Sequence, residues 1–190
     1  MNPARPAAVV SDAANSSHES AAAQVTEAFQ AIRAELLSTL TYMLHHRDDA
    51  ADMLQETFVK CWRARATLAG VDNPRAWIFR VAMNCAKDHQ RSAWKRRVQP
   101  MAPEDLMLTT QETPMVGFPM EQRETLDRLK LAILSLRSDE REVFLLRQNG
   151  ELTYEEIADI RGAPVGTIKT QMRAALQKLR KVLQDDPGGT

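Results

Sequence analysis

The sequence predicts an all-α protein with two small helical domains joined by an irregular linker, the C-terminal one containing a helix-turn-helix. Apolar residues recur at steps of three and four along most of the chain, which is the period of amphipathic helices. Only 7 glycines and 5% aromatic residues occur among 190 residues, a composition that argues against a sheet protein. A proline-rich stretch without periodicity, residues 98–121, separates two periodic regions and predicts the linker.

The charges are segregated although the formal net charge is zero. An acidic cluster lies within residues 48–56, and a basic cluster lies within residues 87–97. A neutral total therefore hides surfaces of opposite sign. Cys61 and Cys85 are too few for a disulfide framework, and the N-terminus has no apolar stretch long enough for a signal peptide or a membrane span. These observations predict a cytoplasmic protein without membrane insertion.

The N-terminal part begins with residues 1–22, which are rich in Ala, Ser, Pro and Asn and predict a disordered tail. We expect the first domain to span residues 23–97. Its first expected helix runs from Val25 to about His46. The second is capped by Asp48 or Asp49 and has a buried stripe of Leu54, Phe58, Cys61 and Trp62. A loop over residues 65–72 follows, and the third helix begins at Asn73-Pro74 and ends at about Arg97.

The linker over residues 98–121 carries one apolar triplet, Leu106-Met107-Leu108, which could form a short docked turn. We expect the second domain over residues 122–184 and a short tail over residues 185–190. Leu126 to Leu136 have helical spacing, and Ser138 can cap a helix that continues to Gly150. The helix-turn-helix follows directly.

Thr153 and Glu156 have the spacing of a capping box, in which each side chain accepts from the backbone amide of the other residue. Gly162 suits the left-handed end of that helix, and Pro164 suits the first position of the next one. The second helix carries a buried stripe predicted to consist of Val165, Ile168, Met172, Leu176, Leu179 and Leu183.

The opposite side of this second helix is basic and has small side chains near its start. No acidic residue occurs from Arg161 to Leu183. A pair of helices joined by a tight turn can enter a DNA major groove when the outer face of the second helix carries basic residues and small side chains. An ordinary helical hairpin with a basic solvated face is the alternative. The predicted outer face consists of Gly166, Thr170, Arg173, Ala174, Gln177 and Lys181, with Lys169 on its flank.

Three stretches together resemble bacterial sigma factors of the extracytoplasmic-function group, the small members of the main sigma-70 family. Residues 48–62, DDAADMLQETFVKCW, resemble the polymerase-binding helix of the second sigma region. Residues 73–84, NPRAWIFRVAMN, resemble the helix that reads the minus-ten promoter element. Residues 152–158 and 164–170, LTYEEIA and PVGTIKT, resemble the fourth region, which reads the minus-thirty-five element.

This resemblance implies a protein that is not an enzyme by itself, and we expect no cofactor, catalytic residue or metal site. Its expected partners are core RNA polymerase, promoter DNA, which is duplex upstream and a melted single strand at minus-ten, and an anti-sigma factor that holds it inactive. The resemblance assigns polymerase binding to an acidic helix face, where exposed carboxylates favour steering and register. The assigned residues are Asp49, Asp52, Gln55, Glu56 and Lys60.

The resemblance also places Asn84 where the family captures a base turned out of the non-template strand. An amide has both donors and an acceptor for the edge of an unpaired base. Arg80, Lys87 and Arg91 recur on the same side of this helix and suit the phosphates of the melted strand.

In the helix-turn-helix, the resemblance assigns minus-thirty-five contacts to Thr167, Lys169, Thr170, Gln171 and Arg173. Gln171 and Ala174 stand where arginines are frequent in the family. Because glutamine pairs with adenine and arginine favours guanine, the promoter preference cannot be copied from relatives.

Two other classes of function are alternatives to this one. An autonomous helix-turn-helix regulator would explain the second domain, but it leaves the acidic helix and Asn84 unexplained, and such regulators usually dimerise on paired half-sites. A metal protein or enzyme could use His45, His46, Asp49 and Asp52, which are close in sequence. This set lacks a matching second cluster, and no nucleophile and base pair is evident.

Overall fold

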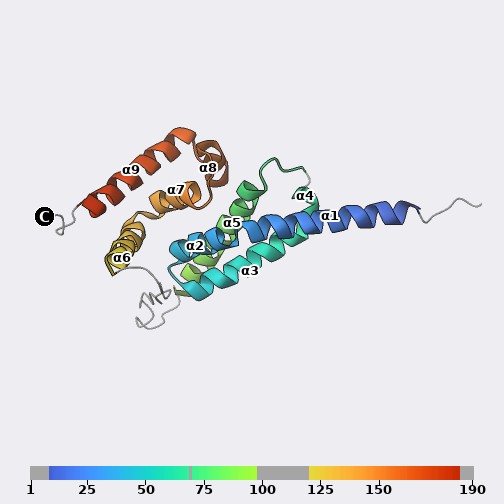
Figure 1. Ribbon diagram of the computed structural model, residues 1–190, viewed down its shortest axis with the longest axis horizontal. Helices are drawn as coiled ribbons and strands as arrows, with labels where there is room; N and C mark the ends of the chain where they lie inside the picture. Colours follow the sequence, from blue (N-terminus) through green and yellow to red (C-terminus); the bar gives the residue numbers. More distant parts are fainter. Residues whose placement is uncertain (1–8, 69, 98–119, 185–190) are drawn as a thin grey trace, which may run out of the picture.

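The computed structural model describes the backbone of residues 9–68, 70–97 and 120–184, and the side chains of residues 20–68, 70–93, 125–182 and 184. Within these ranges every regular element is a helix, which confirms the predicted all-α class (Figure 1). None of the described helices is long and apolar enough to cross a membrane. The expected linker, its Leu106-Met107-Leu108 turn and the tail over residues 185–190 lie wholly or mostly outside the described residues.

Among the described residues, five helices form the N-terminal domain. The long helices α2, α3 and α5 pack against one another, and α1 contacts α3, α4 and α5. Phe79, Leu36 and Leu40 are among the largest side chains that are fully buried between them. The elements are α1 (Val9–Ala31), α2 (Arg33–Leu44), α3 (Arg47–Arg63), α4 (Arg65–Leu68) and α5 (Pro74–Arg97).

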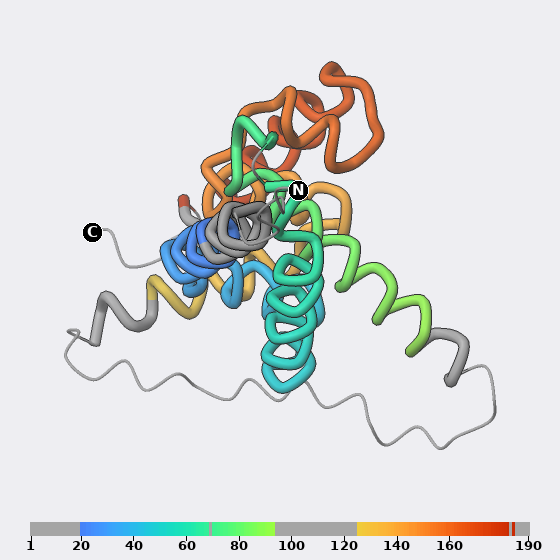
Figure 2. The backbone as a smooth tube through the Cα atoms, turned by 90° about the vertical axis from the view of Figure 1, so that its right-hand side faces the viewer, coloured from blue at the N-terminus to red at the C-terminus, as the bar shows by residue number. Residues whose placement is uncertain are grey.

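Four helices form the C-terminal domain, in which α9 contacts each of the other three. Leu145, Ile157 and Ile168 are fully buried at their junction. Figure 2 shows the orange and red helices at the top of the molecule and the yellow α6 lower, at the left. Contacts join α2 to α7 and α5 to α8. The elements are α6 (Met120–Ser135), α7 (Ser138–Gln148), α8 (Tyr154–Arg161) and α9 (Val165–Gln184).

The N-terminal tail differs from its prediction, because α1 begins at Val9 rather than after Ala22. Residues 9–22 lack an apolar stripe, but alanine has the highest helix propensity and lets a helix propagate from the packed part of α1. The single helix expected from Val25 to His46 is divided at Ile32, whose backbone (φ −118°, ψ 8°) is not helical. Ile32 is itself buried, so the break lies inside the core.

Three local expectations, about a cap, a buried stripe and a loop, were wrong. His46 caps α3, with its ring nitrogen Nδ1 accepting from the amide of Asp49, so neither Asp48 nor Asp49 is the cap. Trp62 is 39% exposed, and the buried face of α3 includes Thr57 but not Trp62. The expected loop over residues 65–72 begins with the short helix α4.

The predicted capping box and the predicted glycine end of the first helix of the helix-turn-helix are confirmed. The hydroxyl of Thr153 accepts from the amide of Glu156, and the Glu156 carboxylate accepts from the amide of Thr153 at 2.8 Å. Gly162 ends α8 in the left-handed conformation (φ 60°). The buried stripe of α9 is rotated from the prediction, since Ala175 is fully buried and Leu176 is 39% exposed.

Candidate nucleic-acid and protein interfaces

The acidic face of α3 is exposed to solvent. Asp52, Gln55 and Glu56 lie on one side of α3 and are exposed. Met53, Leu54 and Thr57 face the core. Lys60 forms an ion pair with Glu56 (2.9 Å), and this hydrogen bond is the main cause of a raised pKa of the Lys60 amine. Asp49 differs from the others, because its carboxylate lies 3.3 Å from the ring of His89 on α5.

An apolar area continues this face toward the end of α3. Val59 is 42% exposed, and Trp62 beside it packs on Phe58 and under the guanidinium of Arg65. The prediction had buried Trp62, so the sequence interpretation missed this part of the surface. The signal available in the sequence was Val59, an apolar residue three positions before Trp62 and outside the predicted buried stripe.

The second candidate surface lies on α5. Arg80, Asn84 and Arg91 are exposed, which places the proposed base-capturing amide between two cations on one side of the helix. Arg91 also pairs with Asp88 (3.4 Å). Lys87 is half-buried instead, because its amine forms an ion pair at 2.9 Å with Glu142 of the other domain. In this conformation Lys87 is committed to a protein contact.

The third candidate surface is the start of α9. Thr167, Lys169, Thr170 and Arg173 are all exposed. The amine of Lys169 lies 5.7 Å from the centre of the Tyr154 ring of α8, a cation–π contact that joins the two helices of the motif. Tyr154, Met172 and Leu176 line a hollow beside these residues together with Lys169, Arg173 and Arg180. The surface is therefore basic with an apolar patch.

Gln171 lies differently from the other expected groove contacts. It is half-buried, and its amide donates to the Asp139 carboxylate on α7 at 3.1 Å. Its side-chain oxygen is buried without a hydrogen-bond partner in the described structure. The structure therefore brings Thr167, Lys169, Thr170 and Arg173 together on one exposed face and places Gln171 at its edge, against α7.

Asn73 and Arg75, at the start of α5, are polar residues whose contacts the sequence interpretation did not anticipate. The Asn73 side chain caps α5 by accepting from the amide of Ala76, as its position suggested, but it also donates to Glu156 of α8. Arg75 reaches backbone carbonyls of the C-terminal domain. Both contacts are non-local, so no spacing in the sequence could reveal them.

The ionisable groups of the described residues show no candidate metal site. No group of three or more His, Cys, Asp or Glu side chains there could hold a metal ion. Burial, followed by the neighbouring Cys85, raises the pKa of the Cys61 thiol to about 12, which keeps it protonated and unreactive. Burial raises the pKa of Glu156, but hydrogen bonds from Thr153 and Asn73 outweigh it and leave that pKa lowered.

Comparison with known proteins gives two family matches in this order along the chain. Residues 28–96 match "Sigma-70 region 2", which covers α2, α3 and most of α5. Residues 126–179 match "Sigma-70, region 4", which covers most of the C-terminal domain. The two matches include every residue expected from the sequence to bind polymerase or DNA.

Individual relatives agree with these matches. The chain is 32% identical over 151 residues to the ECF RNA polymerase sigma factor SigL of Mycobacterium tuberculosis, covering 76% of this chain and 81% of the relative. It is 27% identical over 162 residues to the RNA polymerase sigma-H factor of Pseudomonas aeruginosa, covering 79% and 81%.

The fold is shared with solved structures at low identity. The sigma factor RpoE of Bartonella quintana, solved with the anti-sigma factor NepR, superposes with a TM-score of 0.73 at 22% identity, covering 85% of this chain and 97% of that one. CnrH, solved with the cytosolic domain of CnrY, superposes with a TM-score of 0.58 at 20% identity, covering 90% and 96%. The two family matches and the relative at 32% identity show that the chain belongs to the sigma-70 family and is an RNA polymerase sigma factor of the extracytoplasmic-function group.

Proposed function

We propose that this sigma factor binds core RNA polymerase through the exposed face of α3 and selects promoters through α5 and α9. The observation that carries this proposal is the separation of three exposed polar faces on three different helices, each inside the family region expected to use it. A duplex-binding regulator that acts alone would have no use for the acidic face of α3 or for Asn84.

Each face suits its proposed target chemically. The carboxylates of Asp52 and Glu56 steer a basic partner and fix its register, while the apolar Val59 and Trp62 beside them supply area to bury. Asn84 presents both an amide donor and an acceptor to an unpaired base, and Arg80 and Arg91 attract the phosphates on either side.

On α9 the exposed Lys169 and Arg173 suit phosphates and base edges of duplex DNA, and the small Gly166 and Thr170 allow close approach to the groove. The Thr170 hydroxyl donates to the carbonyl of Gly166 at 2.9 Å, which fixes its rotamer. For Gln171 the bond to Asp139 supports a positioning role between α7 and α9 beside the proposed base contact.

The proposal extends to regulation and place of action. Both solved structures that resemble this fold were obtained with an anti-sigma factor or a cytosolic partner domain, and we infer a comparable protein inhibitor for this chain. Because core polymerase is cytoplasmic, the protein acts there. It carries no enzymatic activity of its own and needs no cofactor.

Transcription in vitro tests the proposal. Purified core RNA polymerase is mixed with the chain and with genomic fragments, and the start sites are mapped. We expect initiation at a small set of sites that share two upstream elements. Failure to bind the core enzyme, or binding without site-specific initiation, would overturn the proposed function.

Charge-reversal variants test whether the exposed face of α3 binds core polymerase. Reversing the charge of α3 by Asp52→Lys together with Glu56→Lys should lower affinity for core polymerase by about a hundredfold, since like charges then meet the partner. Glu56→Lys alone and Glu27→Lys, at an exposed position of α1, change the net charge equally, and the Glu27 variant should bind normally. Equal losses in these two single variants would show that only net charge matters.

Binding to upstream duplex libraries separates the roles on α9. Lys169→Ala should weaken binding to all sequences and reduce its salt dependence, because it removes a phosphate contact. Gln171→Ala should relax sequence preference at one position if Gln171 reads a base. Asp139→Ala removes the hydrogen bond between Asp139 and Gln171 but keeps the Gln171 side chain. If this variant also has an altered sequence preference, the result would support a role for Asp139 in positioning Gln171.

A further inference from the structure

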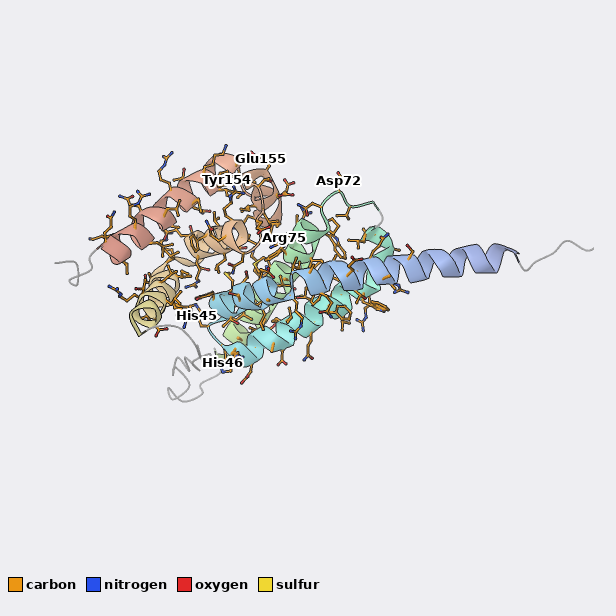
Figure 3. The ribbon with its side chains drawn as sticks, in the orientation of Figure 1. His45, His46, Asp72, Arg75, Tyr154 and Glu155 are labelled. Carbon is orange, nitrogen blue, oxygen red and sulfur yellow. The ribbon has the colours of Figure 1, made fainter. Side chains whose placement is uncertain are left out.

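The two flanks of α9 differ in where their polar groups lead. At about 100° per residue, Lys169 and Arg173 lie roughly 160° around the helix from Gln171, and the exposed Thr170 lies between them. On the first flank the amine of Lys169 lies over the ring of Tyr154, which Figure 3 labels at the start of α8. On the other flank Gln171 contacts α7. A DNA duplex lying against Thr170 therefore meets α8 on one side and α7 on the other.

The major groove of DNA has a phosphate backbone along each of its two edges. The groove is about 12 Å wide, and an α-helix with its side chains is about 10 to 12 Å across, so a helix in the groove fits closely between the two backbones. Contacts from Lys and Arg to these phosphates supply much of the affinity of such complexes. Lys169 and Arg173 share one flank of α9 and can serve one edge of the groove. The other edge then lies along the flank of Gln171.

Arg137, the residue before α7, stands at the flank of Gln171. Its side chain is 74% exposed, and its Nε lies 3.6 Å from Oδ1 of Asp139. The other oxygen of the same carboxylate accepts from the side-chain amide of Gln171 at 3.1 Å. A single carboxylate thus bridges the guanidinium of Arg137 to the edge of the proposed groove-reading face.

A second chain of contacts fixes the backbone of Arg137 to α9. Its amide donates to the carboxylate of Glu140 at 3.2 Å, and that carboxylate pairs with Lys178 of α9 at 2.6 Å. The carbonyl of Asp139 also accepts from Arg161 of α8 at 2.9 Å. Because both its backbone and its side chain are linked to α9, Arg137 keeps its position relative to this helix when the helix enters a groove.

Arg137 can bind an anion more readily than the two cations nearest to it. Lys178 and Arg161 are held by buried carboxylates of α7, at 2.6 Å and 3.2 Å. The ion pair of Arg137 with Asp139 is exposed and longer, and exposed pairs of this kind are weak. A guanidinium has five N–H donors in a planar fork, which suits bidentate binding of a phosphate.

We propose that Arg137 binds a phosphate on the edge of the major groove opposite the edge bound by Lys169, so that the start of α7 takes part in minus-thirty-five binding. This inference rests on the proposed function and deepens it. A phosphate contact carries no base information, so Arg137 adds affinity and fixes the register of α9 without changing the preferred sequence. The sequence interpretation gave Arg137 no role, because this residue lies outside the helix-turn-helix.

Removal of the charge provides the first test. The chain is assembled with core polymerase, and its affinity is measured for a promoter fragment identified by mapping start sites. Arg137→Ala should lower this affinity by about tenfold and reduce the slope of log affinity against log salt by about 0.9. Arg137→Lys keeps the charge and should retain most of the affinity. Arg33→Ala, at an exposed position of α2, is the matched control and should bind normally.

Neutral phosphates provide the second test and locate the contact. Methylphosphonate groups are placed one at a time along each strand of the minus-thirty-five element, and each contacted phosphate shows a loss of affinity when it is neutralised. Arg137→Ala should abolish this loss at one phosphate, and Lys169→Ala should abolish it at a phosphate of the opposite strand. A merely structural role of Arg137 would instead weaken binding to every fragment alike.

Three outcomes would overturn the inference. In the first, Arg137→Ala keeps full affinity for the promoter fragment. In the second, it lowers the affinity by the same factor on every neutralised fragment. In the third, it acts on the same phosphate as Lys169→Ala. The proposed function fails in a different way, because the unmodified chain with core polymerase would then give no site-specific initiation before any variant is made.

Discussion

The two domains bury different kinds of polar group. In the N-terminal domain, Thr39 and Thr57 are the buried polar residues among those described, and each hydroxyl donates to a carbonyl of its own helix. In the C-terminal domain, three consecutive charged residues of α7 are buried, namely Glu140, Arg141 and Glu142. The first domain is thus held by apolar packing, and the second also depends on charge pairs between helices.

These charge pairs replace core volume that short helices cannot supply. Glu140 pairs with Lys178 of α9 (2.6 Å), and Glu142 pairs with Arg161 of α8 (3.2 Å) as well as with Lys87. A buried ion pair adds little net stability, but removal of one partner leaves an uncompensated charge. The C-terminal domain should therefore be the one that breaks when a single polar group is removed.

The largest effect is expected from a cavity in the N-terminal domain. Phe79 is fully buried, and Phe79→Ala should lower the free energy of unfolding by about 4 kcal/mol. All three tryptophans of the chain belong to this domain, so their fluorescence reports its unfolding alone. Urea titration should show an earlier fluorescence transition, and an unchanged midpoint would contradict the packing described for α5.

Glu142→Ala should have the next largest effect, by about 3 kcal/mol, because Arg161 and Lys87 then lose their common partner. Circular dichroism, which reports both domains, should shift more than the tryptophan fluorescence. Glu155→Ala, at an exposed carboxylate of α8, is the matched control and should change stability by less than about 0.5 kcal/mol. Equal shifts of both signals would mean that the domains unfold as one unit.

A smaller effect is expected from the cap of α8. Thr153→Ala removes the hydroxyl that accepts from the amide of Glu156 and should cost about 1 kcal/mol, visible in the dichroism transition. Thr67→Ala, at an exposed position of α4, controls for loss of a threonine elsewhere. Were the two variants equally stable, the capping box would contribute nothing measurable.

The smallest effect concerns pH at the boundary between the domains. Burial first, and the Arg141 charge second, lower the pKa of His45. The folded chain therefore resists the proton that the unfolded chain accepts below its ordinary pKa near 6.5, so stability is present above pH 6.5 and declines as the pH falls below it. Urea titrations at pH 7.5 and 5.5 should show a smaller pH difference for His45→Gln than for the unmodified chain. An identical difference would exclude His45 as a contributor.

Local sequence signals predicted much of the fold. The capping box at Thr153 and Glu156, the glycine at position 162 and the start of α5 after Asn73 depend on residues a few positions apart, and each is confirmed. Errors arose where periodicity alone chose a face, as with Trp62 and Leu176, because a stripe leaves the packing angle of its helix undetermined.

The sequence by itself determined the all-α class, the helix-turn-helix and the family, since these depend on spacing and on matched stretches of residues. Only the tertiary structure decided which partners the polar side chains take. Lys87 was expected to face DNA and Gln171 to face the groove, yet they contact Glu142 and Asp139. Gln171 and Asp139 are 32 positions apart in the sequence, and Arg75 and its acceptor Gly150 are 75 positions apart. Such partners meet only when separately formed helices pack, a step that no local pattern encodes.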